Sequence, residues 1–166
     1  MIEPLELYAP GLLVAYGKLE QATAKQNRVY WRLKMFAQLM AATLQRCEYC
    51  IDLGSQIARH SGLSDERLLT LPRNRENALF THQEKLVLAY AAGMSSAPVD
   101  VSDDLFTELR EHFDKAKLVE LRSVIALENM CGRFNLALGF GAAGFSEGMV
   151  CAAPANTPDP TAQRSN

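Results

Sequence analysis

The residues with the clearest capacity for chemistry are Cys47 and Cys50, which enclose Glu48 and Tyr49 in the run Cys-Glu-Tyr-Cys. Residues three apart on a helix share a face, so the two sulfurs can approach closely enough to form a reversible disulfide. In such chemistry the attacking species is a thiolate, and the positive end of a helix dipole lowers a thiol pKa. If a helix begins near Cys47, that thiol gains most from the dipole.

Two acids next to the pair act in the opposite direction. Glu48 and Asp52 bring negative charge, which disfavours a thiolate, and the sequence does not decide which effect is larger. A pair of buried cysteines that merely fill space is the plainest alternative. A zinc site normally needs four ligands and often a second such pair, whereas the other two cysteines, Cys131 and Cys151, stand apart. We therefore expect neither a metal nor a cofactor.

Helices are the elements predicted to position the pair. Residues 27–46 form a strong helical pattern, with Trp31, Phe36 and Met40 as expected core residues. The pattern resumes from residue 48 to about 60. An earlier helix is expected over 12–23, with its start interrupted at residues 10–11.

Start and stop signals divide the rest of the chain into further helices. Gly62 is typical of a helix C-terminus, and N-caps are predicted at Ser64, Thr81, Ser102 and Asp114. Thr81 begins a capping-box pattern, and the helix after Asp114 is expected to reach about residue 138. No run alternates convincingly with a period of two. The fold class is thus all-α: one compact domain over residues 1–150 with about six to seven helices, followed by a flexible tail over 151–166.

Composition excludes several classes of protein. The 166 residues carry 17 Lys and Arg against 19 Asp and Glu, for a net charge of −2. These charges are interspersed, with no basic stripe for nucleic acid. No apolar run approaches the roughly 18 residues that span a bilayer, and no secretory signal is evident. We expect a cytoplasmic protein that binds neither nucleic acid nor membrane, with reduced thiols.

Two other patterns are assigned structural roles. Residues 139–144 match G-x-G-x-x-G, but no strand precedes them, so we interpret them as a helix stop and not as a nucleotide site. Cys131 falls on an apolar helical stripe and is expected to be buried and inert. The three histidines do not pair with a cysteine by spacing.

The stretch 44–54, Leu-Gln-Arg-Cys-Glu-Tyr-Cys-Ile-Asp-Leu-Gly, resembles the carboxymuconolactone decarboxylase / alkylhydroperoxidase D-like family. Residues 63–68 and the last helix, from Ile125 through Asn135 to Gly139, also resemble it. The resemblance covers most of residues 26–145. It implies an alkylhydroperoxidase D-like all-α fold that assembles into a helix-packed homo-oligomer.

The hydroperoxidase branch of this family implies an antioxidant, peroxidase-like oxidoreductase that reduces a small peroxide or exchanges a disulfide. One cysteine becomes a sulfenic acid, the other resolves it as a disulfide, and a dithiol reductant partner restores the pair. The decarboxylase branch lacks the thiol pair, so Cys47 and Cys50 favour the redox branch.

Two positions depart from the hydroperoxidase pattern. Its histidine, four residues after the second cysteine, is Gly54 here, and its glutamate, twelve residues before the first, is Met35. The usual proton relay is therefore absent from its usual positions. The alternative function is a non-catalytic or differently acting family member that binds or senses.

Glu128 is our candidate for a replacement. It lies on a helical stripe that begins at Leu121 and Ile125 and turns polar without changing face. We hypothesise that Glu128 faces the dithiol across the space left by Gly54 and acts there as a base. The alternative is a structural Glu128 bonded to Arg133 or to the backbone. The predicted catalytic residues are thus Cys47, Cys50 and Glu128.

Overall fold

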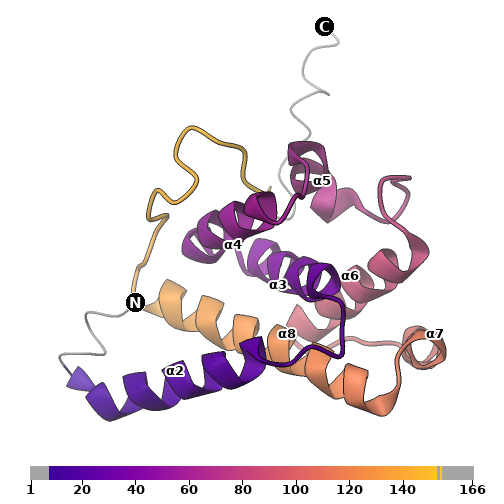
Figure 1. Cartoon of the computed structure of the whole chain (residues 1–166), viewed down its shortest axis with the longest axis horizontal. Coiled ribbons are helices and arrows are strands. Elements are labelled where there is room, and N and C mark those ends of the chain that lie inside the picture. The colour runs from indigo at the N-terminus through magenta and orange to yellow at the C-terminus, as the bar shows by residue number, and fades with distance from the viewer. Residues whose placement is uncertain (1–7, 153, 155–166) are drawn as a thin grey trace, which may run out of the picture.

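The computed structural model describes residues 8–152 and 154. This part of the chain contains no β-strand and forms seven α-helices and one short 3-10 helix (Figure 1). The all-α prediction is confirmed. In chain order the elements are α2 (Pro10–Ala24), α3 (Trp31–Gln45), α4 (Glu48–His60), α5 (Asp65–Thr70), η1 (Leu71–Arg73), α6 (His82–Ser95), α7 (Asp103–His112) and α8 (Lys115–Ala137).

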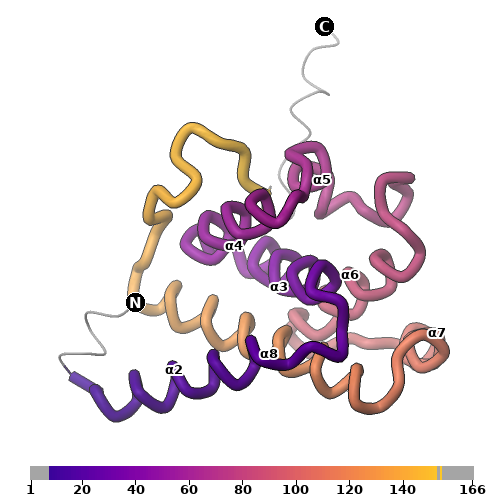
Figure 2. Tube along the Cα trace, viewed as in Figure 1, coloured from indigo at the N-terminus to yellow at the C-terminus, as the bar shows by residue number. Residues whose placement is uncertain are grey.

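Helix α3 is the centre of the fold and packs against α4, α6 and α8 (Figure 2). Phe36 and Met40 are buried as predicted, and Leu39 beside them is almost completely inaccessible to solvent. They join one core cluster with Leu88 of α6 and with Leu121 and Ile125 of α8. Helix α2 lies at the edge of the molecule and packs on α8. No helix in the described part is both long enough and apolar enough to cross a bilayer.

The four predicted N-caps are confirmed. The side chains of Ser64, Thr81, Ser102 and Asp114 each accept a hydrogen bond from a backbone N–H in the first turn of the helix that follows. Gly62 has a φ of +86°, the left-handed conformation that favours glycine just after a helix. These are local signals, which a sequence alone can reveal.

The start of α3 differs from the prediction. The pattern from residue 27 suggested a helix there, but α3 begins at Trp31. The N–H groups of Arg28 and Val29 donate instead to the buried carboxylate of Glu120, at 2.9 and 3.3 Å. A contact across the fold thus satisfies the donors that a longer helix would have used.

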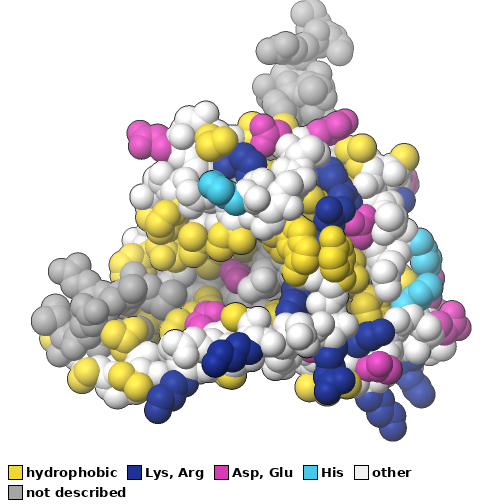
Figure 3. All heavy atoms as spheres, viewed as in Figure 1, with side chains coloured by type: hydrophobic (Ala, Val, Ile, Leu, Met, Phe, Trp, Pro, Cys, Tyr) yellow, Lys and Arg dark blue, Asp and Glu magenta, His cyan; other side chains and the backbone are white. Residues whose placement is uncertain are grey.

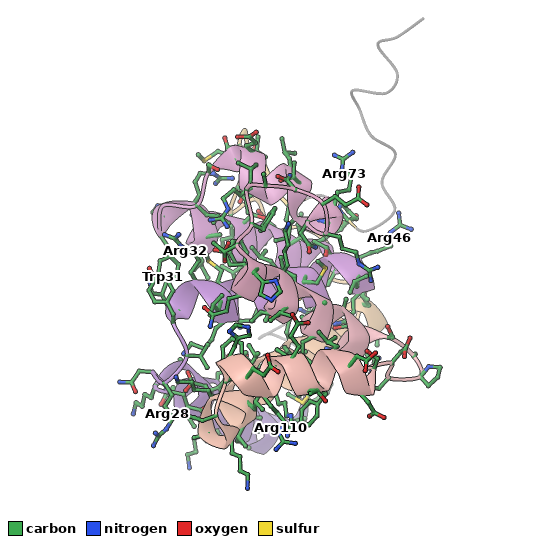
Figure 4. All side chains as sticks on the ribbon, turned by 90° about the vertical axis from the view of Figure 1, so that its right-hand side faces the viewer. Arg28, Trp31, Arg32, Arg46, Arg73 and Arg110 are labelled. Carbon is green, nitrogen blue, oxygen red and sulfur yellow. The ribbon has the colours of Figure 1, made fainter. Side chains whose placement is uncertain are left out.

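Two further expectations near the N-terminus are corrected. Trp31 is not a core residue: it is 39% exposed, and Figure 4 shows it at the surface beside Arg32, whose guanidinium lies 5.7 Å from its ring. Pro10 does not interrupt the first described helix but begins it, because proline needs no hydrogen-bond acceptor in the first turn.

Residues 139–152, named here the C-terminal strap, run from the end of α8 back over α4 (Figure 1). The Asp52 carboxylate accepts hydrogen bonds from the N–H groups of Ala143, Phe145 and Ser146, at 2.9, 3.0 and 2.7 Å. Ala152 is buried, so the strap continues into the predicted tail. The rest of that tail lies outside the described residues, apart from Pro154.

Replacing Asp52 with asparagine should lower the free energy of unfolding by about 2–3 kcal/mol, because a buried acceptor of three N–H groups loses its charge. Burial alone would raise the pKa of Asp52, but these hydrogen bonds outweigh it and lower the pKa. The stabilisation is therefore present above the ordinary carboxyl pKa of about 4 and is lost as the pH falls through the folded-state value.

Chemical denaturation of both proteins from neutral to acidic pH checks this. The difference between wild type and Asp52→Asn should narrow as the pH falls, whereas the exposed control Glu111→Gln should track wild type. A pH-independent difference would show that the charge on Asp52 does not hold the strap.

Candidate active site

The dithiol lies at the corner between α3 and α4. Arg46 turns the chain there with a φ of 58°. Helix α4 begins at Glu48, as its helical pattern predicted, and Cys47 is its N-cap. Its Sγ accepts a hydrogen bond from the N–H of Cys50 at 3.3 Å. The two cysteines are thus presented from the first turn of one helix, where the helix dipole favours negative charge.

The two sulfurs have different access to solvent. Cys47 is fully buried, Cys50 is partly exposed, and both are free thiols. The side-chain amide of Asn135, on α8, lies with its Nδ2 3.8 Å from Cys47 Sγ and 3.5 Å from Cys50 Sγ. An amide nitrogen has two hydrogens, so it can donate to both sulfurs at once.

These contacts separate the acidities of the two thiols. The Cys50 thiol donates to Cys47 Sγ and lowers the pKa of Cys47 to about 6, against the effect of burial, with further help from backbone N–H groups and Asn135. The same hydrogen bond, burial and the nearby charge of Glu128 raise the pKa of Cys50. At neutral pH the pair therefore holds one negative charge and one shared proton.

Glu128 faces the dithiol, as hypothesised. Burial raises its pKa to about 7, and the negative charges of Cys47 and Glu20 add to the rise, while a hydrogen bond with the Cys50 thiol opposes it. A carboxyl group with this pKa can both donate and accept a proton at neutral pH. Its hydrogen-bond partner is the Cys50 sulfur.

Cys50 and Glu128 open into a cavity of about 460 Å³ between α2, α3, α4 and α8. Figure 3 shows the surface hollowed between α2 and the helices above it, with hydrophobic side chains along the upper edge. Gly54 and Met35 also line this cavity. The two positions that depart from the hydroperoxidase pattern therefore line the same cavity as the carboxyl group of Glu128.

Three residues at the far wall of the cavity were not predicted as functional. Tyr16 donates to Glu20 Oε1 at 2.6 Å, and its hydroxyl lies 2.6 Å from Cys131 Sγ. Cys131 is buried, as expected, but it has polar partners. Asn135 was also missed, although it follows Glu128 by two helical turns on the stripe that suggested Glu128.

Within the described residues, no group of three or more His, Cys, Asp and Glu side chains is arranged to hold a metal ion.

The family model of the carboxymuconolactone decarboxylase family matches residues 10–93, about half of the chain. The chain is 41% identical over 99 residues to the uncharacterized protein YnjA of Escherichia coli (strain K12), a match that covers 59% of this chain and 54% of YnjA. It is 27% identical over 120 residues to the uncharacterized protein YdfG of Bacillus subtilis (strain 168), covering 72% of this chain and 82% of YdfG. The chain thus spans about half the length of YnjA.

Two solved structures share the fold. A protein from Agrobacterium tumefaciens, a putative antioxidant defence protein AhpD, superposes with a TM-score of 0.76 at 24% identity and covers 81% of this chain and 92% of its own. The debrominase Bmp8 in complex with 2,3,4-tribromopyrrole also has a TM-score of 0.76, at 20% identity, and covers 82% of this chain and 73% of its own. With the matched family model and the dithiol at the start of α4, these findings show that the chain belongs to the carboxymuconolactone decarboxylase family.

Proposed function

We propose that this protein is a thiol-dependent oxidoreductase that reduces peroxides with Cys50 and Cys47. One observation supports this most directly: Cys50 opens on a cavity beside Glu128, while Cys47 lies buried behind it and within reach of a shared hydrogen bond. This arrangement suits a first thiol, Cys50, that reacts with the substrate, and a second thiol, Cys47, that resolves the sulfenic acid.

In the first step the shared proton passes from Cys50 to Cys47, which places the thiolate at the cavity wall. Cys50 Sγ attacks the terminal oxygen of the peroxide; the S–O bond forms and the O–O bond breaks. The sulfur is oxidised to a sulfenic acid and the peroxide is reduced. Protonated Glu128 gives its proton to the departing oxygen, which leaves as an alcohol or as water.

In the second step Cys47 attacks Cys50 Sγ. The S–S bond forms, the S–O bond breaks, and the hydroxyl group leaves as water with the proton that Cys47 held. A dithiol reductant then exchanges with the disulfide, becomes oxidised itself and restores both thiols. Glu128, now a carboxylate, is the base that takes up a proton as the pair is regenerated.

The proposal is tested by oxidising the reduced protein with less than one equivalent of hydrogen peroxide or cumene hydroperoxide, then alkylating the remaining thiols and mapping them by mass spectrometry. A disulfide between Cys47 and Cys50 should form in proportion to the added peroxide. Cys131 and Cys151 should stay reduced and should therefore be found alkylated. With excess dithiothreitol the protein should consume many equivalents of peroxide.

Each alternative predicts a different result. A disulfide that forms without turnover would indicate a sensor, and turnover with disulfides alone would indicate a disulfide exchange protein. Absence of any Cys47–Cys50 disulfide would overturn the redox proposal and favour a non-catalytic binding protein.

A further inference from the structure

The cavity beside Cys50 has a polar end with a definite chemical character. Glu20 of α2 is held there by the hydroxyl of Tyr16, at 2.6 Å, and the thiol of Cys131 lies 3.6 Å from the same carboxylate oxygen. Both neighbours orient Glu20, so its position is set by α2 and α8 together. The carboxyl group of Glu128 also lines this cavity.

The ionisable groups that line the cavity are acids, thiols and tyrosines. No lysine, arginine or histidine is among the described residues of its wall. In addition, Asn135 is fully buried, and its Oδ1 has no hydrogen-bond partner in the described part of the protein. A buried acceptor without a donor costs free energy, which a bound donor would recover.

The remaining wall is apolar. Leu13 of α2, Leu39 of α3 and both Leu53 and Ile57 of α4 line it, together with Met35. An apolar group bound against this wall would remove hydrocarbon surface from water on both sides. The cavity thus combines an apolar wall with a polar end that is rich in acceptors.

We propose that this cavity binds uncharged, largely apolar molecules that carry a hydrogen-bond donor, and that Glu20 acts together with Glu128 to exclude anionic ones. If the proposed function is correct, on which this extension to peroxides rests, a peroxide that carries a carboxylate should be reduced more slowly than the same peroxide without one. A carboxylate on the same molecule would meet negative charge with no cation to balance it.

Binding of non-reactive probes tests this without any peroxide. The first probe is cumyl alcohol, the neutral product of cumene hydroperoxide reduction, and the second is the same alcohol with a carboxylate on its ring. Each is added at mildly alkaline pH, and its protection of Cys50 against alkylation by iodoacetamide is measured by mass spectrometry. The neutral probe should protect at a concentration at least about tenfold lower than the anionic one.

Two variants of α2 separate charge from shape. Glu20→Gln should lower the concentration at which the anionic probe protects, although the carboxylate of Glu128 remains in the cavity. Tyr16→Phe, which keeps the charge of Glu20, should leave that concentration as in wild type. Glu111→Gln, on α7, is the control for net charge and should behave as wild type. Circular dichroism confirms that each variant is folded.

Equal protection by both probes, or protection by neither, would overturn the inference. Because the assay contains no peroxide, its result does not depend on the proposed peroxidase function. A protein that fails to reduce peroxides could still show charge-selective binding in this cavity. Conversely, equal protection by the two probes would leave peroxide reduction untouched.

Discussion

Cys50→Ser is expected to lose peroxide reduction by about a thousandfold or more, and Cys47→Ser to lose turnover while keeping its first oxidation. The two variants should differ because the two cysteines differ in their access to the cavity. Cys50 lines the cavity, so a serine there removes the nucleophile that meets the peroxide. Cys47 is fully buried, so a serine there removes the thiol that resolves the sulfenic acid. It also removes the sulfur that takes up the Cys50 proton, so the first oxidation should be slower than in wild type. Serine is also a good N-cap, so the start of α4 should be retained.

A single dose of peroxide in the presence of dimedone distinguishes the two variants. Cys47→Ser should accumulate a dimedone adduct on Cys50, and Cys50→Ser should give no adduct on Cys47. Cys151→Ser is the matched control and should turn over as wild type. If the adduct instead formed on Cys47 in Cys50→Ser, the roles of the two cysteines would be reversed.

Much of the fold could be predicted because its signals are local. A side chain that caps a helix acts on a backbone group two or three residues away, so Ser64, Thr81, Ser102 and Asp114 marked helix starts from the sequence alone. The helical pattern that resumes at residue 48 likewise predicted the start of α4, directly after Cys47.

The errors arose where distant segments meet. Glu120 lies about 90 residues from the N–H groups of Arg28 and Val29, and no local pattern reports that contact, which delays the start of α3. Trp31 shares the helical period of the core stripe but lies in the first turn of α3, at the surface. Periodicity identifies a face of a helix, and the neighbouring elements decide how much of it is covered.

The site was predicted in part for the same reason. Cys47 and Cys50 are three residues apart and could be paired from the sequence, whereas Asn135 reaches them from α8 over more than 80 residues. Glu128 was found because its stripe turned polar without changing face. Glu20 gave no such signal, because α2 has little buried surface and so no clear inner face.

Glu128→Gln should slow peroxide reduction by about a hundredfold near neutral pH, because an amide cannot supply the proton that the departing oxygen needs. In wild type the reactive form requires a thiolate in the dithiol, where the Cys50 hydrogen bond lowers the pKa of Cys47 to about 6. It also requires a protonated Glu128, whose pKa burial raises to about 7. The rate should therefore rise with pH through about 6 and fall above about 7, and the falling limb should disappear in Glu128→Gln.

Glu128→Gln should lose activity but gain stability against unfolding. Because burial raises the folded-state pKa of Glu128, the stability that its protonated form contributes is present at low pH and is lost as the pH rises through about 7. Glu128→Gln holds no charge in either range. The variant should thus unfold at a higher denaturant concentration than wild type at mildly alkaline pH. A gain in stability on replacing a residue is typical of residues that serve function at a cost in stability.

Alkylation by iodoacetamide separates proton donation from a merely structural role for Glu128. Alkylation needs a thiolate but no proton for its leaving group, and removing the negative charge of Glu128 removes one cause of the raised pKa of Cys50. Glu128→Gln should therefore alkylate at Cys50 as fast as wild type or faster, while it reduces peroxide more slowly; Glu111→Gln should change neither rate. If both reactions slowed together, Glu128 would act by positioning the dithiol, and proton donation to the departing oxygen would have to come from elsewhere.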